Sequence, residues 1–187
     1  MDPIAPITGS VDKIEELIGH SPHPAIVALP IGAWTVSNIC DGLAMLTGKD
    51  AYDDVARVSM AIGLVGAAGA VVTGLRDYSY IPKDRPSHDT ATAHAIGNAV
   101  VGSLFTASYI LREMDHQRGR STGILSRMLA LAGGGLTLYT AWLGGVLVEE
   151  YGEGVKPVMD QMDDGDEDAS RGRERLSPWS PLGVHGD

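Results

Sequence analysis

Charged side chains are almost absent from four long stretches of this 187-residue chain, although the whole chain carries a net charge of -10. Each stretch is long enough to cross the hydrocarbon core of a bilayer, roughly 30 Å, as a helix. A helix also satisfies its own backbone hydrogen bonds, which lipid cannot do. The scarcity of charge therefore excludes a soluble protein and predicts an all-α bundle of four transmembrane helices. The stretches are residues 23–46, with Asp41 as the one charge, 58–75, 90–111 and 128–148.

Cysteine is nearly absent as well, since Cys40 is the single one in the chain. One cysteine cannot form an intramolecular disulfide, a multi-thiolate metal site or the ligand set of an iron–sulfur cluster. The sequence also has no glycine-rich phosphate loop, no nucleophile elbow and no zinc-protease motif. The glycines that are present indicate packing instead, because Gly66, Ala70 and Gly74 recur every four residues and let a neighbouring helix approach closely.

The two ends of the chain are polar and lower the mean hydropathy to +0.03. Residues 1–22 lack the basic start and cleavage site of a signal peptide, and Val11, Ile14, Leu17 and Ile18 mark a short amphipathic helix that we expect at the membrane surface. Residues 23–156 form the expected transmembrane domain. Residues 157–187 predict a flexible charged tail, either simply solvated or binding a partner.

The chain also repeats itself with an offset of 71 residues. In the first and third stretches, His23 aligns with His94, Trp34 with Phe105 and Asp41 with Arg112; in the second and fourth, Gly63 aligns with Gly134 and Gly74 with Gly145. Small residues also match by chance, so a duplication and a coincidence both remain open. A duplicated two-helix unit would have its symmetry axis along the membrane normal.

The polar residues of the first stretch share one helix face. His23 and Asp41 are 18 residues apart, which corresponds to about five helical turns and about 27 Å. Polar groups in lipid face the bundle interior, so we expect His23 to meet His94 near one membrane face. We expect Asp41 to meet Arg112 near the other face, where Arg57 also lies. A structural ion pair is the favoured interpretation of these charges, and a proton or ion pathway is the alternative.

Two neutral imidazoles that approach from opposite helices at one depth suit the axial positions of a b-type haem. We therefore treat His23 and His94 as candidate ligands of a haem iron, with Asn98, Trp34 and Phe105 as candidate residues around the cofactor. In the competing interpretation His23 only starts its helix, His94 bonds a neighbouring carbonyl, and the aromatic rings pack the core.

The segment between the second and third stretches adds another histidine on the same side. His88 and His94 are six residues apart, which places them on different helix faces and argues against a two-histidine metal site on one helix. A mixed site of His23, Asp77, His88 and His94 stays as an alternative.

Several short motifs together resemble a known bacterial family. They are His23-Pro-x-x-Val-x-x-Pro-Ile-Gly-x-Trp34, Asp41, Gly74-Leu-x-Asp77, His94 with Asn98, and Leu143-Gly-Gly-x-Leu-Val148. Over residues 19–156 the chain is similar to the four-helix membrane proteins grouped as domain of unknown function 2231. Some members of that family are joined to or encoded near Rieske iron–sulfur modules, so the resemblance implies a redox setting. This chain has no Rieske cysteines, so an electron partner would be a separate protein.

The leading functional hypothesis is a single-haem electron carrier or quinone-linked redox subunit of the cell membrane, with no nucleic-acid partner. The alternative is a cofactor-free membrane scaffold or assembly protein. A small transporter is less favoured, since no helix is broken in mid-membrane. The basic connection around Arg118 and Arg120 predicts a cytoplasmic loop, with both termini and the histidines outside.

Overall fold

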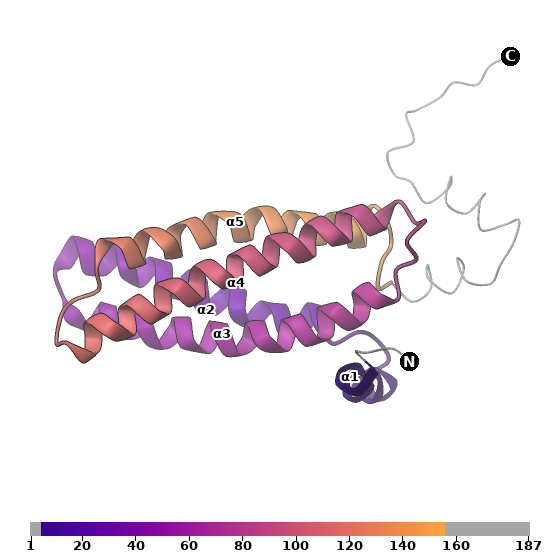
Figure 1. The fold of residues 1–187 in the computed structure, drawn as a ribbon, viewed down its shortest axis with the longest axis horizontal. Helices are drawn as coiled ribbons and strands as arrows, with labels where there is room; N and C mark the ends of the chain where they lie inside the picture. The colour runs from indigo at the N-terminus through magenta and orange to yellow at the C-terminus, as the bar shows by residue number, and fades with distance from the viewer. Residues whose placement is uncertain (1–4, 156–187) are drawn as a thin grey trace, which may run out of the picture.

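The computed structural model describes residues 5–155, all of whose regular structure is helical. It confirms the expected fold class, a bundle of four long helices preceded by one short helix (Figure 1). The tail expected at residues 157–187 lies outside the described residues. The helices are α1 (Ala5–Ile18), α2 (His23–Thr47), α3 (Asp50–Ser79), α4 (Ser87–Gln117) and α5 (Ile124–Glu149).

Helices α2 to α5 are each long and apolar enough to cross a membrane. They continue beyond the uncharged stretches of the sequence by several residues, because a helix need not end where the hydrocarbon core ends. The turn after α2 is tight: Gly48 has φ +67° and closes the helix with a 2.8 Å bond from its N–H to the carbonyl of Ala44. Glycine adopts this left-handed conformation without steric cost.

The four spans form a ring in which each helix contacts two others. Helix α2 packs most closely on α3, and α4 on α5, while α3 also contacts α4 and α2 contacts α5. Within the described chain α2 and α4 are therefore diagonal to each other, as are α3 and α5. The start of α2, the end of α3 and the end of α5 lie at one end of the bundle, together with α1 (Figure 1).

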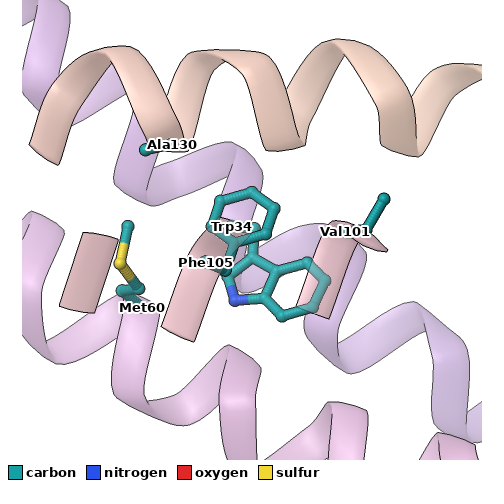
Figure 2. Close-up of a cluster of buried hydrophobic side chains, with 5 residues drawn as sticks. All are labelled: Trp34, Met60, Val101, Phe105 and Ala130. Carbon is teal, nitrogen blue, oxygen red and sulfur yellow. The ribbon is translucent and has the colours of Figure 1, made fainter. Parts of the chain in front are cut away.

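The centre of the bundle is a small apolar cluster that draws on all four spans (Figure 2). Trp34 of α2 and Phe105 of α4 stack across the diagonal, with ring centroids 4.1 Å apart and an interplanar angle of 12°. Bulky rings meet here because α3 and α5 present glycine: a Cβ on Gly63 would lie 2.3 Å from the Trp34 ring, and one on Gly133 would lie 2.9 Å from Phe105. The spacing of small residues thus marks close packing, as expected.

The buried positions of the two hairpins match, but not with one offset throughout. In α2 and α4 the offset is 71, because Pro30, Trp34, Ser37 and Asp41 correspond to the buried Val101, Phe105, Ser108 and Arg112. In α3 and α5 it is 70, since Ala56, Met60, Gly63 and Thr73 correspond to the buried Ser126, Ala130, Gly133 and Leu143.

The alignment expected for the second helices was therefore wrong by one residue. The counterpart of Gly63 is Gly133, which lies against Phe105, and the counterpart of Gly74 is Gly144, which lies against His94. The physical reason is that one residue fewer separates the matching buried positions of the second hairpin, although its loop, 118–123, is longer than the loop at 48–49. Ser37 bonds a carbonyl 19 residues ahead, whereas Ser108 bonds one 18 residues ahead.

Candidate functional site

His23 opens α2 with its ring turned toward α3. Its Nδ1 lies 2.9 Å from the hydroxyl oxygen of Thr73. The single hydroxyl proton of Thr73 goes back to a carbonyl of its own helix, with Gly69 at 3.1 Å and Ala70 at 3.2 Å. In the tautomer that completes this arrangement, His23 Nδ1 donates to Thr73 and Nε2 carries a lone pair.

His94 takes the corresponding place in the second hairpin. Its Nδ1 lies 2.8 Å from the backbone carbonyl of Thr140 in α5. A carbonyl only accepts, so Nδ1 carries the proton and Nε2 again carries a lone pair. The side-chain amide of Asn98 donates to that Nε2 at 3.1 Å and also to the carbonyl of His94 at 2.9 Å.

Both imidazoles rest on a glycine of the partner helix in their own hairpin. A Cβ on Gly74 would lie 2.8 Å from His23 Cε1, and one on Gly144 would lie 3.2 Å from His94 Cε1. The rings are thus held by a hydrogen bond at Nδ1 and by close contact with helix backbone. Histidines that bind metals are commonly oriented in this way, with one nitrogen donating and the other left as a ligand.

The two histidines belong to diagonal helices and lie at one end of the bundle. Both side chains are half-buried. The arrangement therefore places two imidazoles on diagonal helices at the same end of the bundle. A bis-imidazole metal centre requires two such ligands.

Trp34 and Phe105, the aromatic pair expected around a cofactor, belong to the buried apolar cluster of the bundle. Trp34 and Phe105 stack directly on each other and are buried at 6% and 0% exposure, which leaves no space for a planar group between them. They close the bundle interior below the histidines. The indole Nε1–H of Trp34 is buried without a hydrogen-bond partner, and such a group lowers stability.

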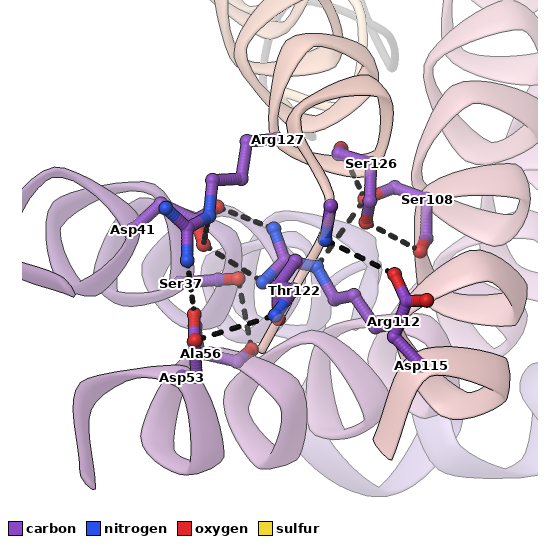
Figure 3. A network of polar contacts seen from close by, with 11 residues as sticks. Ser37, Asp41, Asp53, Ala56, Ser108, Arg112, Asp115, Thr122, Ser126 and Arg127 are labelled. Carbon is purple, nitrogen blue, oxygen red and sulfur yellow. Dashed lines mark hydrogen bonds and ion pairs between the residues drawn. The ribbon is translucent and has the colours of Figure 1, made fainter. Parts of the chain in front are cut away.

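Asp41 and Arg112 meet at the opposite end of the bundle (Figure 3). The two terminal nitrogens of the Arg112 guanidinium face the Asp41 carboxylate, with Nη1 at 2.8 Å from Oδ1 and Nη2 paired with Oδ2. The Arg112 side chain is fully buried. Its Nε lies 3.4 Å from Ser108, whose hydroxyl donates to the carbonyl of Ser126 in α5. A buried bidentate pair of this kind is strongly directional.

The third member of this charged group is Arg127 of α5. It lies 3.8 Å from Asp41 and bonds Asp53 of α3 at 2.7 Å, so the network includes a charged side chain from every span. Arg57 is not in contact with Asp41. It bonds Glu113 at 3.2 Å and lies 3.9 Å from Asp54.

His88 is separated from the two interior histidines. Its Nε2 lies 3.2 Å from the hydroxyl of Tyr78, whose other neighbour is Thr92 at 2.8 Å. Among residues 5–155, no group of three His, Cys, Asp or Glu side chains is placed to hold a metal ion. The mixed site of His23, Asp77, His88 and His94 is therefore not assembled.

Several contacts could be found only in the structure. Thr73, which orients His23, lies next to the Gly74 motif and is a rare polar residue in an uncharged stretch. Arg127 follows Arg57 by 70 residues, so the corrected repeat would have drawn attention to it. The carbonyl of Thr140 has no sequence signal, because every residue has a carbonyl.

Comparison with known proteins agrees with this architecture. A family model described as predicted membrane protein (DUF2231) matches residues 19–157, which include all four spans. No curated protein and no solved structure is detectably similar to the chain.

Proposed function

Because the chain belongs to the DUF2231 family of multi-pass membrane proteins, we propose a function from its own geometry: a membrane electron carrier that binds one b-type haem through His23 and His94. The observation that carries this proposal is the matched state of the two imidazoles. Each Nδ1 lies at hydrogen-bond distance from a fixed partner on the next helix, and the tautomer with its proton on Nδ1 keeps a lone pair on Nε2. Low-spin haem iron takes two axial ligands of this type.

The surrounding residues fit such a group in specific ways. Thr73 and the carbonyl of Thr140 contact the Nδ1 atoms of the two rings, and Gly74 and Gly144 let the rings approach the helix backbone closely. Trp34 and Phe105 form an apolar floor below the site, which helps to exclude water. A bound haem would supply a one-electron redox centre, and the protein would supply ligands, orientation and a low dielectric.

The position of the histidines also limits the partners. They lie at one end of the bundle, so a single haem would exchange electrons at one membrane face with a quinone or a separate redox protein. Alone it would not carry electrons across the bilayer. The basic connection between α4 and α5 favours a cytoplasmic location for the opposite end, with the histidines outside.

A second candidate function is a cofactor-free membrane scaffold or assembly protein. The observation that favours it is the hydrogen bond from Asn98 to His94 Nε2, which satisfies that imidazole without any ligand. In this case both histidines would only join the helices of each hairpin.

Haem binding separates the two candidates. Full-length protein expressed with ample haem and purified in detergent should show the Soret and α bands of low-spin haem. His23→Ala and His94→Ala should each abolish the low-spin spectrum, because one remaining imidazole cannot keep the iron six-coordinate. His88→Ala should keep it, since His88 bonds Tyr78 outside the pair.

Each variant is also compared with the wild type in gel filtration and thermal unfolding, so that misfolding is recognised. A colourless wild-type protein would end the haem proposal and favour the scaffold. A low-spin spectrum that survives in either alanine variant would remove that histidine as a ligand.

A further inference from the structure

The short helix α1 lies across the bundle rather than along it. Figure 1 shows it almost end-on beside the last turns of α3, at the end of the bundle where the histidines lie. Helix α1 packs against α3, and Val11 is buried there at 3% exposure. Since the spans follow the membrane normal, the axis of α1 runs roughly in the membrane plane.

A group of charges ties α1 to α3. Arg76 bonds Asp12 at 2.9 Å and forms an ion pair with Glu15, so one guanidinium holds two successive turns of α1. The same guanidinium lies 4.4 Å from the ring centre of Tyr80. The position of α1 therefore rests on contacts that are mostly shielded, because the Arg76 side chain is only 14% exposed.

Much of the apolar face of α1 remains exposed among the described residues. Ile14, Leu17 and Ile18 are 46%, 86% and 44% exposed. At about 100° per residue they fall within one arc of the helix, which begins at the docked Val11. The exposed Glu16 points about 160° away from Ile14, so α1 separates an apolar side from a charged one.

We propose that α1 is a membrane-surface helix whose Ile14, Leu17 and Ile18 side chains lie among phospholipid. Helix α1 lies at the end of spans that are long and apolar enough to cross a membrane, so its exposed apolar residues lie near the boundary of the bilayer. An interfacial helix buries its apolar face roughly 5 to 10 Å into the boundary between headgroups and acyl chains. Residues 5–18 contain three acidic groups and one basic group, so the lipid contact is apolar and does not need anionic headgroups.

The surface helix is also connected to the candidate site. Arg76 lies 3.4 Å from Asp77, which accepts a 2.6 Å bond from the hydroxyl of Ser21. The same hydroxyl accepts a 3.1 Å bond from the backbone N–H of His23. Helix α1, the end of α3 and the first residue of α2 therefore form one connected unit. A fixed position of α1 at the membrane surface would hold the start of α2, and with it His23, in place through these contacts.

Nitroxide labels measure the depth of α1 directly. In a Cys40→Ala background, the full chain is reconstituted into phosphatidylcholine vesicles with a label at Ile14→Cys or Leu17→Cys, and at Glu16→Cys as the control. The first two labels should be relaxed by oxygen and shielded from a water-soluble nickel complex, and the control should show the reverse. Addition of phosphatidylglycerol should leave the depths unchanged.

Two results would overturn the lipid assignment. Equal exposure of all three labels to nickel would place α1 in water. Shielding of the Ile14 and Leu17 labels from both reagents would mean that protein, such as a second copy of the chain, covers the face.

The link from α1 to His23 is tested with the variant Arg76→Gln. The control is Lys83→Gln in the neighbouring exposed segment. Loss of the guanidinium should raise the mobility of the Leu17 label and shift the nitrogen NMR signals of the His23 ring. The control should change neither. If Arg76→Gln leaves both the label mobility and the His23 signals as in the wild type, α1 does not hold His23 in position.

Discussion

The two histidines rest on matching glycines, Gly74 and Gly144, but they differ in a neighbour one helical turn further along. Asn98 follows His94 by one helical turn and bonds its Nε2, whereas the equivalent residue after His23 is Val27. The second hairpin thus covers its imidazole Nε2 with an amide, and the first has an apolar residue at the corresponding position. In a haem centre, Nε2 of His23 could bind the iron without displacing an asparagine. Nε2 of His94 could bind the iron only after Asn98 turns away.

Replacing Asn98→Val should make the second site like the first. The nitrogen NMR signal of His94 Nε2 should move toward that of an unbonded imidazole, while His23 should stay unchanged. Haem affinity should rise by about fivefold, because a hydrogen bond of about 1 kcal/mol no longer competes for the lone pair. The reciprocal variant, Val27→Asn, should lower affinity. Unchanged signals in Asn98→Val would show that the amide does not hold His94.

Within each hairpin, glycine decides how closely two helices approach. Gly63 and Gly74 admit Trp34 and His23 on the first hairpin, and Gly133 and Gly144 admit Phe105 and His94 on the second. Transmembrane helices associate through such close packing, since lipid supplies no hydrophobic force between them. The same glycines therefore determine both the hairpin contact and the orientation of the candidate ligands.

A methyl group at Gly63 should disturb the packing, because it would lie 2.3 Å from the Trp34 indole. Gly63→Ala should destabilise the protein by about 1 to 3 kcal/mol, as overpacking usually does. The control is Gly102→Ala, where a Cβ meets nothing within 4 Å. It should stay within about 1 kcal/mol of the wild type, on the stable side, through helix propensity. Denaturant titration in detergent micelles compares the two, and equal stabilities would contradict the close contact.

A buried network of charged side chains joins the spans at one end of the bundle. The half-buried His23 and His94 lie at the other end. Asp41, Asp53, Arg112 and Arg127 come from four different spans and form a continuous network. The stacked Trp34 and Phe105 separate this network from the histidines. The network joins the two hairpins, which otherwise contact each other less closely than they contact themselves.

Breaking the central pair should therefore weaken the bundle as a whole. Asp41→Ala should cost about 3 to 5 kcal/mol, because it leaves the buried Arg112 without its main partner. The double variant Asp41→Leu with Arg112→Leu should recover much of that loss, since it removes both charges. Arg57→Gln, which affects a partly exposed pair with Glu113, should cost less than about 1 kcal/mol. Unfolding in detergent measures all three, and a double variant no better than Asp41→Ala would contradict pairing as the cause.

The sequence by itself determined the four spans, the faces that turn inward and the pairing of ends. Scarce charge marks a helix in lipid, and helical periodicity relates His23 to Asp41 and His94 to Arg112 by depth and face. For this reason the contact between Asp41 and Arg112 could be expected from residue numbers alone. The short helix at the N-terminal end was visible for the same reason, since its apolar residues recur on one side.

Only the tertiary structure decided which side chains meet within a face. Helical periodicity does not say how many residues separate matching positions of two helices, so the one-residue difference between the hairpins could not be expected. The roles of Gly133 and Gly144 depend on that difference. Periodicity does not give interhelical distance either, so it could not show that Arg127 rather than Arg57 neighbours Asp41, or that Trp34 stacks directly on Phe105. Hydrogen bonds to backbone carbonyls, such as that of His94 to Thr140, depend on helix rotation and separation, which packing alone determines.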